Sequence, residues 1–185
     1  MKRLFESWRR YATSTEANEP EDPSEMTLYH VSSVPDIEVL DPAIAAKNVR
    51  NYTQREYRTW DRPRVFYFTK WGQKDIGIGR IMGNPYRVKI RSSELYSVMD
   101  DPLKLSHPER EEEYKDIRLT EKGIPEYYPI NRFEMVATLG EREHGFKGFI
   151  YPQGENRDNE IVVLWEPAPA EKVDKTFYTN RKGEE

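Results

Sequence analysis

The sequence predicts one α+β domain, built from two small antiparallel or mixed sheets and two or three helices. Short apolar runs at 28–32, 65–69 and 161–165 have the length and residue types of buried strands. Helix start signals stand at Asp41-Pro42 and at Asn131. A chain of 185 residues is long enough for one domain with its own core and short for two.

The composition disfavours several classes of protein. The chain contains no cysteine, which excludes a disulfide scaffold and thiolate metal sites and fits an intracellular protein. No apolar run approaches the roughly 18 residues of a membrane-spanning helix, so we expect no membrane partner. The three histidines are widely separated, and we predict no metal site. The net charge of −4 argues against a dedicated nucleic-acid binder.

The N-terminal 25 residues differ from the rest of the chain. Apolar side chains at helical spacing predict a short basic amphipathic helix: Leu4, Phe5, Trp8 and Tyr11. Residues 12–25 follow as an acidic linker. Two roles stay open for this helix, namely packing on its own domain and docking a partner. The domain itself is expected at 26–174, and residues 175–185 are expected to form a loose tail.

Within the domain we expect further elements in a regular order. The expected strands are 37–40, 86–90 and 146–151, and the expected helices are 42–51 and one that begins after Asn131 and ends at Gly145. Glu134 is at the position of a capping-box glutamate. Residues 94–103 are expected to leave the sheet through a turn. Residues 104–130 are charged and contain proline, and we expect a long loop or insertion there.

The composition of two segments allows more than one interpretation. Segment 47–64 is rich in arginine interleaved with aromatic residues, which suits contact with nucleic acid or with a nucleotide, although solvated arginines beside anchoring aromatics form the same pattern. Segment 71–80 contains three glycines but lacks the spacing of a dinucleotide-binding fingerprint, so we expect a turn or short helix.

Three polar side chains occur in the apolar strands in a suggestive order. His30 is in the first strand, Tyr67 in the buried strand 65–69, and Glu160 begins the last apolar strand. We expect the three strands to pair and to place these side chains around one pocket. Each residue also has an ordinary structural role: a polar strand edge for His30, a core aromatic for Tyr67, and a solvent-facing strand start for Glu160.

The segments 29–32, 65–69, 145–151 and 160–164 carry a resemblance to a known family. They resemble the ADP-ribosyltransferase fold in its His-Tyr-Glu variant, which occurs in diphtheria toxin and the poly-ADP-ribose polymerases. Segment 94–103 and the Gly-aromatic-x-Gly strand are similar to transferase-like domains of phage and mobile-element proteins. The resemblance covers roughly residues 27–173.

The resemblance implies NAD as cofactor and a role for each motif residue. Glu160 is then the catalytic carboxylate, which stabilises the cation that develops at the ribose. His30 holds a ribose hydroxyl, and Tyr67 stacks on the nicotinamide ring. Further candidate cofactor contacts are Ser32, Arg50 and Arg64, with Arg80 as another possible partner for the pyrophosphate. Val31 follows the motif histidine where the family often has glycine, and we expect its side chain to crowd the nicotinamide carboxamide.

Three functions follow as expectations. The first is a phage or mobile-element transferase that modifies a host protein or nucleic acid, located in the host cytoplasm or packaged in a virion. The second is a catalytically inactive binding module of the same fold, which contacts a protein or nucleic acid through segment 47–64. The third is a structural virion or accessory protein without a ligand.

Overall fold

The computed structural model describes residues 24–48, 62–70, 83–124, 129–153 and 159–173. Several expectations lie outside these residues. They are the N-terminal helix and its linker up to residue 23, most of the basic aromatic segment including Arg50, the glycine-containing segment with Arg80, and the tail after 173.

The described chain contains nine strands and three α-helices. The strands are β1 (Glu25–Ser32), β2 (Val39–Leu40), β3 (Val65–Phe68), β4 (Asn84–Arg91), β5 (Leu95–Ser97), β6 (Gly148–Gln153), β7 (Asn159–Leu164), β8 (Ala168–Pro169) and β9 (Glu171–Lys172). The helices are α2 (Pro42–Asn48), α4 (Glu111–Lys122) and α5 (Arg132–His144).

Seven strands form one mixed sheet, and two form a second, small sheet. The order in the large sheet is β5-β6-β7-β3-β1-β4-β9, and β2 pairs with β8. Only β5 and β6 run parallel among these strand pairs. The α+β class with three helices and a mixed sheet is therefore confirmed. Two sheets are present as expected, but only the second is small, because seven of the nine strands join the large sheet.

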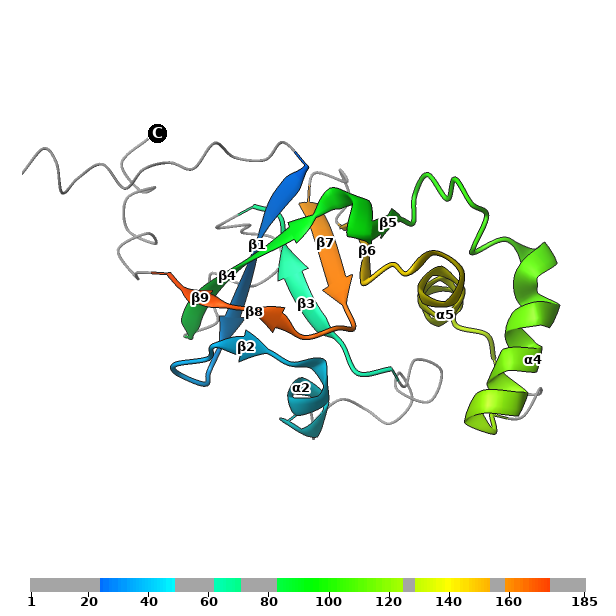
Figure 1. Ribbon diagram of the computed structural model, residues 1–185, viewed down its shortest axis with the longest axis horizontal. Coiled ribbons are helices and arrows are strands. Elements are labelled where there is room, and N and C mark those ends of the chain that lie inside the picture. The colour runs from blue at the N-terminus through cyan, green and yellow to red at the C-terminus, as the bar shows by residue number, and fades with distance from the viewer. Residues whose placement is uncertain (1–23, 49–61, 71–82, 125–128, 154–158, 174–185) are drawn as a thin grey trace, which may run out of the picture.

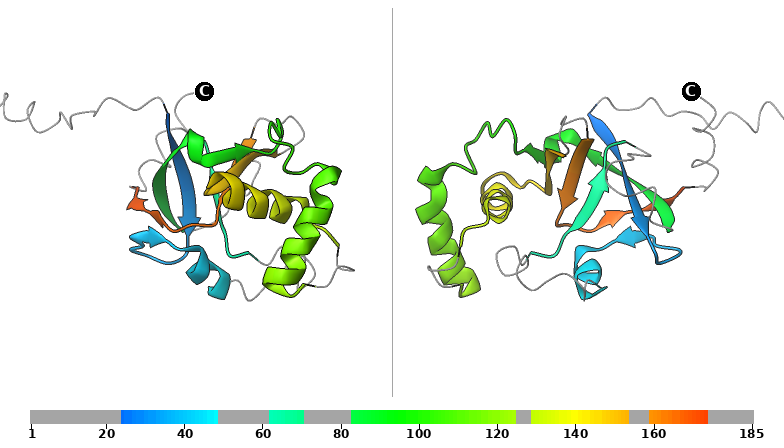
Figure 2. Two further views of the ribbon diagram at one scale, coloured as in Figure 1. Left: turned by 45° about the vertical axis from the view of Figure 1, so that its right-hand side comes forward. Right: turned by 180° about the vertical axis from the view of Figure 1, so that it is seen from behind.

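The large sheet separates two apolar cores (Figures 1 and 2). On one face, Leu28, Tyr67 and Val162 pack with residues of β2 and β8. On the other face, Phe149, Ile161 and Val163 pack with residues of α4 and α5. Figure 1 shows α5 and α4 beside the part of the sheet that contains β5 and β6. It shows α2 and β2 near the place where β1 ends and β3 begins. Period-two alternation thus divides the side chains of β3 and β7 between the two cores.

The helix boundaries follow the expected caps. Asp41 Oδ1 accepts a hydrogen bond from the Ala43 amide at 2.8 Å, at the start of α2. Asn131 Oδ1 accepts from the amides of Phe133 and Glu134, and Gly145 ends α5 at φ 69°. The cap signals at Asn131 and Gly145 are confirmed.

Three expectations about the second half of the chain need correction. Residues 111–122 of the expected long loop form α4, which buries Tyr114 and Ile117 on one side. Segment 94–103 does not simply leave the sheet, because Leu95–Ser97 pairs in parallel with β6. Glu134 is 1% exposed and makes ion pairs instead of closing a capping box.

Asp101 organises the loop between β5 and α4. Its carboxylate accepts hydrogen bonds from the Tyr96 hydroxyl and from the Ser106 hydroxyl, the latter at 2.7 Å. Burial raises the pKa of Asp101, but these hydrogen bonds outweigh it and hold the pKa below its usual value. Burial, followed by the hydrogen bond to Asp101, raises the pKa of Tyr96 to about 12. The turn expected within residues 94–103 agrees with this arrangement after β5.

We expect Asp101→Asn to lower the free energy of unfolding by about 1–3 kcal/mol at neutral pH, because hydrogen bonds to a charged acceptor are lost. A lowered folded-state pKa contributes stability above the unfolded value of about 3.9, and that stability disappears as the pH falls through the folded pKa. Urea unfolding at several pH values should therefore show the difference from wild type narrowing below about pH 4. Asp100→Asn, which loses one exposed contact with Ser97, is the control. Equal losses for both variants would contradict this role.

Gly148 allows β6 to approach its neighbours. A Cβ atom built there would lie 2.3 Å from the Val163 carbonyl oxygen and 2.4 Å from Leu164 Cδ2. We expect Gly148→Ala to destabilise the fold by about 3 kcal/mol, because backbone must shift. Gly123→Asn is the control, since nothing lies within 4 Å and asparagine tolerates its φ of 64°. Denaturation midpoints measure both, and an unchanged Gly148→Ala midpoint would refute the close approach.

Candidate functional site

His30 and Tyr67 are direct neighbours across the β1–β3 pair. The register joins Tyr29 to Phe68 in antiparallel strands, so His30 is opposite Tyr67 and both side chains leave the same face of the sheet. Their ring centroids are 5.7 Å apart with an interplanar angle of 56°. The structure thus brings together two of the three expected motif residues.

The His30 ring is fixed by a hydrogen bond to backbone. Its Nδ1 lies 2.9 Å from the carbonyl oxygen of Phe66, which can only accept, so the geometry assigns the proton to Nδ1. Burial lowers the pKa of His30, against the opposing effect of this hydrogen bond. His30 is therefore neutral at physiological pH, with the lone pair on Nε2 as an acceptor.

Tyr67 is fully buried. Its hydroxyl has no hydrogen-bond partner among the residues that the structure describes. Burial raises the pKa of this hydroxyl, which stays protonated. An unpartnered buried hydroxyl is uncommon and marks this position as a candidate for a bound polar group.

Glu160 lies on the same face, at the start of β7. Tyr67 pairs with Val162, so Glu160, two residues before Val162, is its diagonal neighbour on the same face, within reach of long side chains. Glu160 is exposed, and Thr69 Oγ1 donates a long hydrogen bond of 3.4 Å to it. The three motif residues therefore share one sheet face, on which Glu160 is exposed, His30 is half-buried and Tyr67 is buried.

A cavity of about 310 Å³ opens beside His30 on that face. Its floor contains His30, Ser32 and Val65, and its wall is formed by side chains between residues 34 and 45. This volume is at the lower end of the range for small-molecule sites. Ser32 also lines the cavity, and its Oγ accepts a hydrogen bond from the Val34 amide at 3.1 Å. Tyr67 and Glu160 are not among its lining residues, so this cavity does not bring all three motif residues together.

Arg64 lies apart from this group. It precedes β3 with the side-chain direction of Phe66, and its guanidinium is 5.6 Å from the Phe66 ring centroid, on the helix-facing side of the sheet. Val31 likewise alternates with His30 and points to the opposite face, where its Cγ1 would be 2.8 Å from a Cβ at Gly83. Val31 is therefore not on the sheet face that carries His30. Arg50 lies outside the described residues.

The cavity wall was missed by sequence reasoning. The pattern of segment 37–51 predicts only a strand and a helix, although in its described part the exposed apolar residues Val39 and Ile44 lie near two acids, Glu38 and Asp41. Tyr86 was likewise interpreted only as a strand residue, yet its hydroxyl accepts from the Ile37 amide and donates to the Val34 carbonyl, both at 3.1 Å. The signal in the sequence that could have indicated this wall is an apolar residue next to an acidic one in a short loop.

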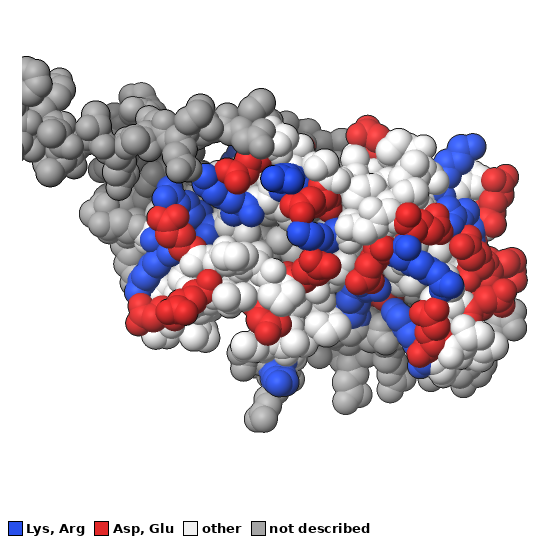
Figure 3. Space-filling model, viewed as in Figure 1, with Lys and Arg blue, Asp and Glu red and all other residues white. Residues whose placement is uncertain are grey.

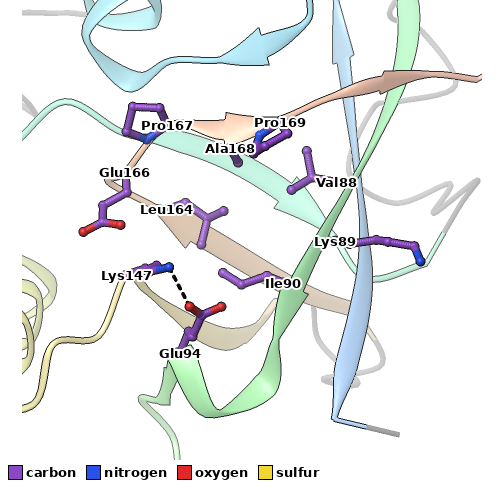
Figure 4. Close-up of a pocket in the computed structure, with 10 residues that line it drawn as sticks. All are labelled: Val88, Lys89, Ile90, Glu94, Lys147, Leu164, Glu166, Pro167, Ala168 and Pro169. Atoms are coloured by element: carbon purple, nitrogen blue, oxygen red, sulfur yellow. Dashed lines mark ion pairs between the residues drawn. The ribbon is translucent and has the colours of Figure 1, made fainter. Parts of the chain in front are cut away.

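A second hollow is a weaker candidate (Figure 4). It measures about 90 Å³ and is lined largely by apolar residues of β4, β7 and the 167–169 segment. Lys147 and Glu94 form an ion pair of 2.6 Å at its mouth and so satisfy one another. Its volume is too small for a dinucleotide.

Neither a metal site nor a membrane span is found in the described part of the chain. No group of three or more histidine and carboxylate side chains is placed to hold a metal ion. No helix there is long and apolar enough to cross a membrane. In comparisons with known proteins, no family model, no curated protein and no solved structure matches this chain.

Proposed function

We propose that this chain is an ADP-ribosyltransferase-like protein that uses NAD to modify a macromolecular target. The observation that supports it is the shared face of His30, Tyr67 and Glu160, with His30 fixed as a neutral acceptor beside a cavity. The resemblance of the sequence to phage and mobile-element domains supports a host macromolecule as that target.

The chemistry assigns a separate task to each residue. The bond between the nicotinamide nitrogen and ribose C1′ breaks, and its electron pair leaves with nicotinamide. A nucleophile of the target then bonds to C1′ and loses a proton. His30 Nε2 accepts a hydrogen bond from a ribose hydroxyl, which orients the sugar. The Glu160 carboxylate stabilises the positive charge that develops on the ribose. The Tyr67 hydroxyl supplies a polar group next to His30.

The direct test is release of nicotinamide from NAD, followed by chromatography. We expect wild-type protein to release nicotinamide and His30→Gln to be about 100-fold slower, because loss of orientation has effects of that size. His144→Gln, which changes an exposed histidine outside the site, is the matched control. No release by wild type would reject the proposal, and equal rates for both variants would remove His30 from it.

The second candidate is a binding module of the same fold without catalysis. It is favoured by the complete burial of Tyr67, which leaves no exposed ring surface for stacking on nicotinamide. In the described part of segment 47–64, Arg62 is paired with Glu134 and Glu141. This candidate predicts salt-sensitive binding to a partner whether or not NAD is present. The combined substitutions Arg55→Ala and Arg58→Ala should weaken that binding.

A further inference from the structure

Exposed apolar side chains gather at the rim of the 310 Å³ cavity. The structure exposes six large hydrophobic side chains among its described residues, and three of them line this cavity: Val34, Val39 and Ile44, at 46%, 47% and 56% exposure. With Glu38 and Asp41 between them, they form a surface that we call the β2–α2 rim. Clustered exposed apolar side chains mark interaction sites, whereas single ones need no explanation.

The β2–α2 rim is held in place by backbone hydrogen bonds. The Tyr86 hydroxyl bridges the Ile37 amide and the Val34 carbonyl. The Ala170 amide donates to the Glu38 carbonyl at 2.8 Å, and β2 pairs with β8 at Val39 and Leu40. Apolar side chains on a fixed backbone bind a partner with little ordering cost.

The charge of the rim selects the kind of partner. Glu38 is exposed, Asp41 is half-buried, and no lysine or arginine in the described chain lines the cavity. Asp41 uses one oxygen to cap α2. Glu38 and Asp41 are the only charged side chains among the described residues that line the cavity, so its lining attracts cations and opposes a polyanion. In Figure 3 the surface around β2 is largely uncharged, with acidic and basic side chains beside it. The rim therefore suits an apolar and basic segment and disfavours a polynucleotide.

We infer that the β2–α2 rim binds a segment of a target protein in which an arginine or lysine adjoins an apolar residue. The apolar residue packs against Val39 and Ile44, and the cation lies between the carboxylates of Glu38 and Asp41. Because the rim adjoins His30, this inference rests on the proposed function for its conclusion that the modified target is a protein and not a nucleic acid.

The test is a titration of the full chain without NAD, followed by methyl signals in NMR. The probe is a short synthetic peptide of leucine and arginine separated by serine. We expect shifts at Val34, Val39 and Ile44 and none at Leu119, an exposed side chain on α4. The same peptide with citrulline for arginine, which keeps the shape without the charge, should bind more weakly. A short single-stranded oligonucleotide should leave these signals unmoved.

Two matched pairs of variants locate the contact. Glu38→Gln should weaken peptide binding by about threefold to fivefold, the effect of one exposed ion pair, while Glu112→Gln on α4 should not. Ile44→Ser should weaken it about fivefold, while Leu119→Ser should not.

The following results would overturn the inference: no shift with the peptide, equal affinity for the citrulline peptide, oligonucleotide binding at these methyl groups, or equal effects within either pair of variants. The nicotinamide assay separates this result from the proposed function. If the peptide binds but NAD is not turned over, the rim is the surface of a binding module. If NAD is turned over but the peptide does not bind, the proposed transferase function stands and the inference about the rim is rejected.

Discussion

Glu160→Gln is expected to slow nicotinamide release from NAD by at least about 100-fold, because a neutral amide cannot stabilise the charge that develops at the ribose. The substitution keeps size and keeps an acceptor for the Thr69 hydroxyl. Glu160 is exposed and contributes no buried surface, so the melting temperature should not change. Single-turnover release at saturating NAD measures the rate, and thermal unfolding measures stability.

The matched control for this result is Glu121→Gln. Glu121 is also an exposed glutamate with one side-chain partner, Arg142 at 2.8 Å, but it is on α4, which packs on the opposite face of the sheet. Its release rate should equal that of wild type. Equal turnover by wild type and Glu160→Gln would exclude Glu160 from the chemistry, whereas no turnover by either protein would favour the binding module.

The second large effect is expected for Glu134→Ala, at about 3 kcal/mol of lost stability. Glu134 is 1% exposed, and its Oε1 lies 2.5 Å from Lys122 Nζ and 3.4 Å from Arg62 Nε. Thr138 also donates to it at 3.3 Å. Truncation leaves two largely buried cations without this partner, which costs far more than the loss of a surface ion pair.

Urea unfolding of Glu134→Ala and Glu141→Ala tests this expectation. Glu141 also pairs with Arg62, but its side chain is 45% exposed, so its removal should cost less than about 1 kcal/mol. A loss below 1 kcal/mol for Glu134→Ala would show that the cluster is not a buried ion network.

The sequence predicted the elements that have local signals. Asn131 and Gly145 define the ends of α5 through side-chain capping and a left-handed glycine, both of which depend on nearby residues alone. The apolar runs of β3 and β7 are continuous because both strands are central in the sheet. These features need no knowledge of distant contacts.

The elements that were missed depend on distant contacts. Helix α4 buries only Tyr114, Ile117 and Arg118, so its apolar stripe is too short to stand out among charged neighbours. Strand β5 has three residues and exists through its pairing with β6. Glu134 has an acceptable capping position, yet Lys122 and Arg62 from remote segments determine its role.

The candidate site was predictable in residue type and only partly in geometry. The strand pattern indicated His30 and Tyr67, but their pairing depends on a register that the sequence leaves open. Alternation along β3 places the Arg64 and Phe66 side chains on the face of the sheet opposite to Tyr67. This could be predicted only once the start of the strand was known. The cavity wall comes from residues 34–45, whose packing against β1 and β3 is a tertiary feature.

Strand β4 has a consequence for the behaviour of the protein at high concentration. In the described part of the chain, β9 pairs with β4 only at Tyr86 and Arg87. The rest of β4 therefore forms an edge of the large sheet. Its outward residues there, Lys89 and Arg91, are charged and exposed. Charged side chains on an edge oppose strand addition by another molecule. The alternation of β4 therefore protects the chain from edge-to-edge aggregation.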